Sequence, residues 1–163
     1  MTGASVKFTS KTVRTAIGAT GIAAVSIFAA ATAVAAPPTT GGFGTSEQLV
    51  DGLLITDYTV SDLQPASVTI PGYTPQGKLY QANITAHANS GVVTPVIADF
   101  NARAPGGQQY RVIDTVPVPN GLSPAPIVQG GQSTGTLYFD VTGAQPNQVA
   151  YNDGVRDVLL WTA

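Results

Sequence analysis

Cysteine is absent from this chain of 163 residues. Its absence excludes disulfide scaffolds, thiolate metal sites and nucleophilic catalysis by a cysteine. Histidine occurs once, at His87, so a zinc site built on several imidazoles is excluded as well, and a serine-histidine-aspartate arrangement would have to use this one residue. We therefore expect no catalytic residues, no metal site and no cofactor, and we expect that the chain is not an enzyme.

Charge is also scarce. Only 10% of the residues are Asp, Glu, Lys or Arg, with 7 basic side chains against 9 acidic ones. A nucleic-acid-binding protein usually carries a basic surplus, so nucleic acid is excluded as a partner. Apolar residues make up 44% of the chain, which is too many for a chain kept disordered by its charge. The composition therefore indicates one folded domain, with a possible appendage.

The few charges are distributed unevenly, and the N-terminal region shows this most clearly. Basic residues occur among the first fourteen residues, and no charged residue occurs from Thr15 to Ser46. The intervening Ala-rich apolar run ends in Ala33-Val34-Ala35. A basic start, an apolar middle and an A-x-A ending are typical of a secretory signal peptide. We predict a signal peptide helix over residues 1–35, cleaved between Ala35 and Ala36. An uncleaved membrane anchor is the alternative, because about 20 apolar residues can span a bilayer.

Cleavage there would leave 128 residues with four basic and nine acidic side chains, a net charge of −5. The leader has no twin-arginine pair, so the general secretory route is expected. We predict a secreted, extracellular protein that is a monomer and has no stable membrane insertion after cleavage.

Period-two alternation of apolar and polar residues recurs along the remainder of the chain. In Leu79–Ala88, one face carries Tyr80, Ile84 and three alanines, and the other carries polar side chains, which is typical of a half-buried strand. Trp161 is expected in the core. Further strands are predicted at residues 53–63, 96–103, 109–116, 136–142, 148–151 and 155–161.

Pro- and Gly-rich turns separate these segments, and no sustained helical period occurs between them. About seven short strands without helices favour a two-sheet antiparallel sandwich over residues 45–163. A small closed barrel is the alternative. Residues 36–44 are rich in Pro, Gly and Thr and are predicted to form a flexible arm.

Seven short runs of residues appear in a recognisable order. They are Val60–Leu63, Ile70–Tyr73, Phe100–Arg103, Tyr110–Val112, Gln132–Gly135, Tyr138–Gly143 and Asp157–Trp161. Together they closely resemble the mycobacterial small secreted immunogenic protein family with an immunoglobulin-like β-sandwich, over about Gly44–Trp161. The resemblance implies an exported antigenic protein with no established enzymatic activity and no catalytic residues. The Pro-rich stretch Pro117–Val128 departs from the family pattern, so the conformation of this loop is not predicted.

Tyr138, Asp140 and Arg111 are the candidate surface-contact residues. Tyr138 and Asp140 are opposite in phase to Leu137 and Phe139, so we expect both on the exposed face of one strand. Arg111 could pair with an acid or with a partner molecule. A ladder of side chains along the sheet face, without a binding role, is the alternative.

Two further hypotheses concern catalysis. His87 shares its strand face with polar residues, and we interpret it as an exposed surface histidine rather than a catalytic base. Asp99 and Asp140 could form the carboxylate pair of a secreted hydrolase if the fold brought them to one cleft.

The leading functional hypothesis is a secreted, non-catalytic binding module for an unidentified partner, a host protein or a component of the cell envelope. Two alternatives stay open: the secreted hydrolase, and a carrier of a small apolar ligand held between the two sheets, which requires an internal pocket of several hundred Å³.

Overall fold

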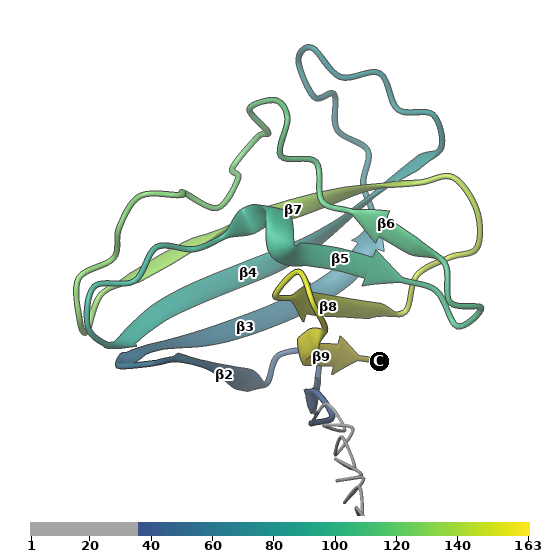
Figure 1. Cartoon of the computed structure of the whole chain (residues 1–163). Coiled ribbons are helices and arrows are strands. Elements are labelled where there is room, and N and C mark those ends of the chain that lie inside the picture. The colour runs from purple at the N-terminus through teal and green to yellow at the C-terminus, as the bar shows by residue number, and fades with distance from the viewer. Residues whose placement is uncertain (1–35) are drawn as a thin grey trace, which may run out of the picture. The chain divides into compact units, whose positions relative to one another are not determined.

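The computed structural model describes residues 36–163, which form nine strands and one short 3-10 helix (Figure 1). One sheet of five strands has the order β1-β9-β8-β5-β6, and a second sheet of four has the order β2-β3-β4-β7. In the five-stranded sheet the strands are β1 (Thr39–Gly42), β9 (Asp157–Thr162), β8 (Gln148–Asn152), β5 (Phe100–Arg103) and β6 (Gln109–Arg111). In the four-stranded sheet they are β2 (Ser46–Asp51), β3 (Leu54–Pro65), β4 (Lys78–Ser90) and β7 (Gln132–Val141). The helix η1 (Ile97–Asp99) precedes β5.

The predicted immunoglobulin-like β-sandwich without disulfides is confirmed, and the closed barrel is wrong because the strands form two separate sheets. Neighbouring strands are antiparallel except for β1 and β9, which are parallel. The predicted signal peptide helix and Ala35 lie outside the described residues. Among residues 36–163, no helix is long and apolar enough to cross a membrane.

The prediction of a flexible arm over residues 36–44 is wrong for part of that segment. Residues Thr39–Gly42 form β1 and pair in parallel with β9, with Gly41 opposite Trp161. The Arg156 guanidinium also donates a hydrogen bond to the Ala36 carbonyl oxygen at 2.7 Å. Pairing with β1 covers backbone groups of β9 that would otherwise form an open sheet edge, which gives a physical reason for order here.

Two predicted strands are shorter than expected. In residues 96–103 the strand begins only at Phe100, because η1 comes first, and Val96 before it is 47% exposed. In residues 109–116 the strand ends at Arg111, and the Ile113 amide bonds across to the other sheet at the Tyr138 carbonyl oxygen. Alternation predicted side-chain phase correctly inside strands, but it could not locate their ends.

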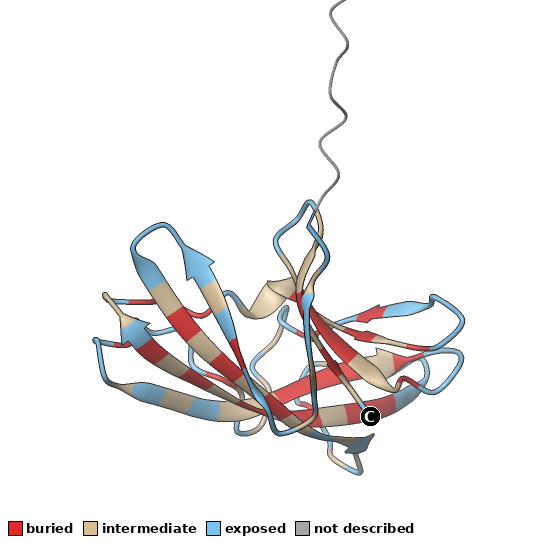
Figure 2. Cartoon of the chain, turned by 90° about the horizontal axis from the view of Figure 1, so that it is seen from below, coloured by how far each residue is buried: buried red, intermediate tan, exposed pale blue. Residues whose placement is uncertain are grey.

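The alternation predicted for β4 is confirmed. Five alternating side chains on one side of the strand are buried, namely Tyr80, Ala82, Ile84, Ala86 and Ala88. Asn83 and Asn89 on the opposite side are exposed. Figure 2 shows the resulting succession of buried and less buried bands along the strands. The buried side of each sheet faces the other and forms the main core.

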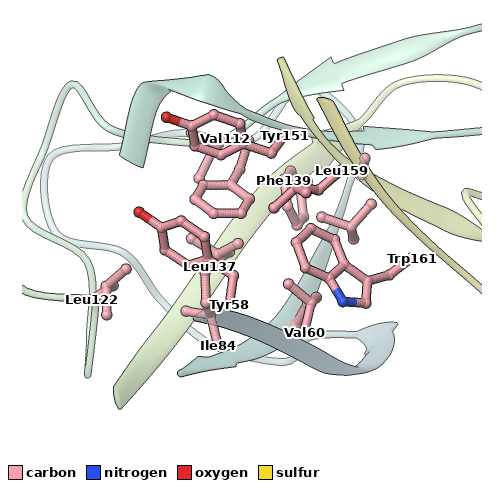
Figure 3. Close-up of a cluster of buried hydrophobic side chains, with 14 of the residues drawn as sticks. Tyr58, Val60, Ile84, Val112, Leu122, Leu137, Phe139, Tyr151, Leu159 and Trp161 are labelled. Carbon is pink, nitrogen blue, oxygen red and sulfur yellow. The ribbon is translucent and has the colours of Figure 1, made fainter. Parts of the chain in front are cut away.

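Aromatic rings fill the space between the sheets (Figure 3). The Phe100 ring packs nearly perpendicular to the rings of Tyr58 and Tyr151, with centroid separations of 5.4 and 5.1 Å. Trp161 is fully buried, as predicted, and its indole N–H donates to the Thr45 carbonyl oxygen at 3.0 Å. A buried indole that keeps its hydrogen bond avoids the desolvation cost of an unpaired donor.

A second, smaller apolar cluster lies on the outward side of β4 and β7. Its buried members are Ile70, Leu79, Ile113 and Tyr138. The long connection at residues 66–77 and the green loop that follows β6 in Figure 1 provide further members of this cluster. These two segments therefore cover part of the outward face of this sheet.

Candidate binding site beneath a proline-rich arch

Tyr138 is not an exposed contact residue, so this prediction is wrong. It does point to the opposite side from Leu137 and Phe139, as the alternation indicated. Its side chain is nevertheless only 4% exposed, because Ile70 and Ile113 pack over it in the second cluster. Strand phase predicts the face of a sheet, but it does not reveal that a distant segment covers that face.

Asp140 also has a structural role. Its Oδ2 atom accepts hydrogen bonds from the Tyr73 hydroxyl at 2.9 Å and the Gln76 amide at 2.8 Å, and its Oδ1 atom accepts one from the Gly77 amide at 2.8 Å. Partial burial raises the pKa of the Asp140 carboxyl, but these donors stabilise the ionised form and outweigh burial, so the pKa is lowered. The carboxylate holds the connection between β3 and β4 against β7.

Arg111 is exposed on β6, in the other sheet from Tyr138 and Asp140. It lines a hollow of about 290 Å³ together with Asp99 and Asn101. The three predicted surface-contact residues therefore do not form one site.

The arrangement does not support a carboxylate pair. Asp99 lies in η1 near the five-stranded sheet, whereas Asp140 lies on the outward side of β7 in the other sheet. His87 is half exposed on β4, and its Nδ1 atom lies 3.7 Å from Asp57 Oδ2. Among the described residues, no three His, Asp or Glu side chains gather into a possible metal site.

The most distinctive feature outside the main core is a loop that leaves the edge of β7 and returns to it. The Ile113 amide donates to the Tyr138 carbonyl oxygen, and the Thr136 amide donates to the Asn120 carbonyl oxygen, both at 2.8 Å. Between these two attachment points, residues 114–119 bulge away from the strand. We call residues 114–119 the arch.

The arch sequence explains why it does not continue as a strand. Pro117 and Pro119 have no backbone N–H, so neither can donate a hydrogen bond to β7. Val116 and Val118, which alternate with them, are half buried and pack against the second apolar cluster. The valines therefore pack the arch against the protein, while the prolines prevent it from forming a regular strand beside β7.

A cavity of about 450 Å³ lies beneath the arch. Its walls are mainly apolar, and they include Ile97, Val112, Val116, Val118, Leu122 and Pro124. Val112 and Leu122 belong to the main core, whereas Val116 and Val118 pack on the second cluster, so the cavity lies where the two clusters meet. This volume is within the range of small-molecule sites. We call it the arch cavity.

The far wall of the arch cavity is held by a close approach of two backbones. A Cβ atom on Gly135 of β7 would lie 2.3 Å from the Leu122 amide nitrogen and 2.4 Å from Leu122 Cα. Only glycine at this position lets the chain after the arch lie directly against β7 and insert the Leu122 side chain into the main core. Figure 3 shows Leu122 at one end of the buried cluster.

Polar groups are few at the arch cavity. Four of its thirteen lining residues have polar side chains, namely Asp114, Thr115, Ser123 and Thr136. Asp114 is exposed, and it has no ion-pair partner among residues 36–163. The cavity can therefore accept an apolar body with a polar end near its mouth.

Sequence reasoning missed this cavity, although it identified the Pro-rich stretch Pro117–Val128 as unusual. The useful signal was the alternation of Val116-Pro117-Val118-Pro119, which combines apolar side chains with missing backbone donors. That pattern indicates a segment that packs on the protein without joining a sheet. It does not reveal which surfaces the segment encloses.

Comparison with known proteins agrees with this fold. Residues 38–161 match the model of a family described as domain of unknown function (DUF1942). The immunogenic proteins MPB63 of Mycobacterium bovis and MPT63 of Mycobacterium tuberculosis are each 42% identical to the chain over 151 residues, which is 91% of this chain and 95% of each relative. The crystal structure of MPT63, described as a secreted protein from Mycobacterium tuberculosis, matches with a TM-score of 0.76 and 42% identity, over 79% of this chain and 100% of that one.

These matches confirm the resemblance to the mycobacterial immunogenic proteins that the seven sequence runs indicated. The family match spans nearly all of the described residues, including the arch and both sheets. The chain therefore belongs to the family described as domain of unknown function (DUF1942).

Proposed function

We propose that this chain is an exported, non-catalytic binding protein that holds a small, largely apolar molecule in the arch cavity. The observation that supports this proposal is the cavity itself: about 450 Å³, mostly apolar walls, and a lining shared by two apolar clusters. The sequence suggested a ligand between the sheets, but aromatic rings fill that space. The cavity lies instead at the β6 and β7 edges, under the arch.

Export is supported by the leader pattern and by the relatives. The relatives carry the name immunogenic protein, and MPT63 is described as secreted. The whole MPT63 structure matches 79% of this chain. The predicted mature chain, 128 of 163 residues, makes up about the same share of the sequence. We therefore propose an extracellular location for this chain and extend the description as an antigen to it.

Calorimetric titration of the purified protein with octanol tests the ligand proposal. Octanol offers an apolar chain and one small polar end, which the arch cavity can accept. Saturable binding of one molecule is expected. Val116→Trp, which places a large side chain on the cavity wall, should weaken binding by about tenfold or more. Thr115→Trp, at an exposed residue that also lines the cavity, is a second obstruction that leaves the buried contacts in place.

Val155→Trp is the matched control, because Val155 is 92% exposed at the β8–β9 turn and does not line the cavity. It should bind octanol as the unaltered protein does. If folded Val116→Trp and Thr115→Trp proteins bound octanol with unchanged affinity, the arch cavity would not be the binding site.

The protein-partner hypothesis keeps one observation in its favour. Leu53, Val92 and Val128 are 89%, 56% and 67% exposed. They lie at one end of the four-stranded sheet, since the Ser90 hydroxyl donates to the Leu53 carbonyl oxygen and the Gly130 amide donates to the Ala88 carbonyl oxygen. Clustered exposed apolar side chains are typical of contact surfaces.

Affinity capture with three baits separates this second candidate from the first. The baits are the unaltered protein, Leu53→Ser combined with Val128→Ser, and Val116→Trp. A protein retained by the first and third baits but lost from the second would support a partner at this end of the sheet. Equal retention by all three baits would contradict it.

A further inference from the structure

A second hollow adjoins the arch cavity on the outward face of the four-stranded sheet. It is lined by Asn83 and Thr85 of β4, Thr134 and Thr136 of β7, and Asn120 at the end of the arch, and its volume is about 450 Å³. We call it the neutral groove. Gly121 and Thr136 line both hollows. The two therefore meet where the chain returns from the arch to β7.

The side chains of the neutral groove have one chemical character. Its polar side chains are amides and hydroxyls, and no charged residue lines it within the described part of the chain. Amides and hydroxyls donate and accept hydrogen bonds, as do the hydroxyl groups of a sugar or another polyol. A carboxylate or phosphate would be matched by Arg or Lys instead, and none lines this groove.

The groove is built on well-anchored elements. Asn83 and Thr85 face Thr136 and Thr134 in the β4–β7 register. The Asn83 amide donates to Asp62 Oδ2 at 2.8 Å, which orients the side chain. Polar groups held in place by paired strands lose little conformational entropy when a ligand binds.

Asn120 is placed by the backbone rather than by a strand. Its carbonyl oxygen accepts the Thr136 amide, and its φ of 50° lies in the left-handed region. Asparagine tolerates this conformation better than most residues, and it also supplies an amide side chain to the groove. Glycine would keep the conformation and lose the amide, so it separates the two roles of this residue.

We propose that the arch cavity and the neutral groove form one site for an amphiphile with a short apolar body and a neutral, polyhydroxylated head group. An alkyl glycoside is the simplest molecule of this class. The inference rests on the proposed function, because the apolar body occupies the arch cavity. The neutral groove adds the selection of the head group.

Four octyl compounds with the same apolar body test the inference: octyl glucoside, octanol, octanoate and octylammonium. Each is titrated into the purified protein by calorimetry, below the concentration at which it forms micelles or, for octanol, a separate phase. Octyl glucoside is expected to bind with a dissociation constant about tenfold below that of octanol. Octanoate and octylammonium should both bind more weakly than octyl glucoside, because no charged residue lines the groove where the head group lies and the Asp114 carboxylate lines the arch cavity instead.

Variants of the groove locate the effect. Thr134→Val removes a hydroxyl at nearly constant shape, and Asn120→Gly removes the amide while keeping the positive φ. Each should raise the dissociation constant of octyl glucoside several-fold and leave that of octanol unchanged. Thr162→Val, in β9 of the other sheet, is the matched control and should change neither constant.

The outcomes separate this inference from the proposed function. Equal affinity for octyl glucoside and octanol would overturn the role of the groove and leave the arch cavity as the ligand site. Tightest binding of octanoate or octylammonium would overturn the neutral head group. Failure of all four compounds to bind would contradict both the inference and the proposed function.

Discussion

The Tyr73 hydroxyl donates a hydrogen bond of 2.9 Å to Asp140 Oδ2, and this contact attaches the connection between β3 and β4 to the outward side of β7. The same carboxylate accepts the backbone amides of Gln76 and Gly77. It thereby fixes one side of the cluster that covers Tyr138 and supports the arch.

Asp140→Asn should destabilise the protein by about 1–2 kcal/mol, because the amide keeps one accepting oxygen and replaces the other with an NH2 group that cannot accept a hydrogen bond. Hydrogen exchange at the Gln76 and Gly77 amides should accelerate. Urea unfolding and exchange measurements check both effects. Asp51→Asn, at an exposed strand end, is the control and should unfold as the unaltered protein does. Unchanged exchange at Gln76 and Gly77 would show that Asp140 does not hold this segment.

The stabilisation by Asp140 should depend on pH. The pKa of its carboxyl is lowered in the folded protein relative to its ordinary value of 3.8. A lowered folded-state pKa means that the contribution is fully present above the ordinary value and is lost as the pH falls through the lower, folded-state pKa. The stability difference between the unaltered protein and Asp140→Asn should therefore shrink below about pH 3.8. A difference that grew with acidification would contradict this assignment.

Alkaline conditions should destabilise the core through Tyr58. Burial, and then the negative charge of Asp99, raise the pKa of the Tyr58 hydroxyl from 10.0 to about 12. A raised folded-state pKa gives stability that is complete below the ordinary value and is lost as the pH rises towards the folded value. Tyr58→Phe should lose less stability than the unaltered protein between pH 10.0 and about pH 12. Denaturant unfolding across this interval measures the difference, and equal losses in both proteins would refute the prediction.

Gly135→Ala should displace the chain that follows the arch. The new Cβ would lie 2.3 Å from the Leu122 amide nitrogen, a separation that requires the backbone to move. Overpacking of this kind costs about 1–3 kcal/mol. The affinity for octanol should also fall, because Leu122 lines the arch cavity. Gly106→Ala, which has open space around the new Cβ, is the control. Normal stability of Gly135→Ala would mean that Leu122 does not lie against β7 in solution.

The ion pair between Arg103 and Asp157 should stabilise the five-stranded sheet even in high salt. Both terminal guanidinium nitrogens, Nη1 and Nη2, contact the Asp157 carboxylate, and the two side chains are only 18% and 21% exposed. Asp157 Oδ1 also accepts the Asn152 amide at 2.8 Å. Asp157→Asn should lower stability by about 1–3 kcal/mol, with little screening by salt. Thermal unfolding at low and high salt checks this, and a loss confined to low salt would indicate an exposed pair.

The sandwich could be predicted from the sequence because the alternation of apolar and polar residues within each strand shows which side is buried. Alternation in β4 placed Tyr80 and Ile84 in the core, and the position of Trp161 near the end of the last strand agreed with its complete burial. These are local patterns that depend on the two-residue period of a strand. The order of seven short runs was enough to indicate the family.

The candidate site depends on contacts between segments far apart in the chain, which local patterns do not contain. Tyr138 had the phase of an outward-facing residue, but Ile70 and Ile113 cover it. Asp140 looked like a surface acid, yet it binds Tyr73, which is 67 residues away. The arch cavity likewise requires Ile97, residues 112–118 and Leu122 to meet around one space. Prolines in the arch signalled the missing hydrogen bonds but not the enclosed volume.

The proposed function requires the arch cavity to bind a small, largely apolar ligand. A titration of isotope-labelled protein with octanol, followed by two-dimensional amide NMR spectra, tests it most directly. We expect saturable shift changes concentrated at residues 112–118, Leu122 and Thr136, with Leu53 and Val155 unaffected. Changes centred on Leu53 and Val128, or no saturable change at residues 112–118, would contradict it.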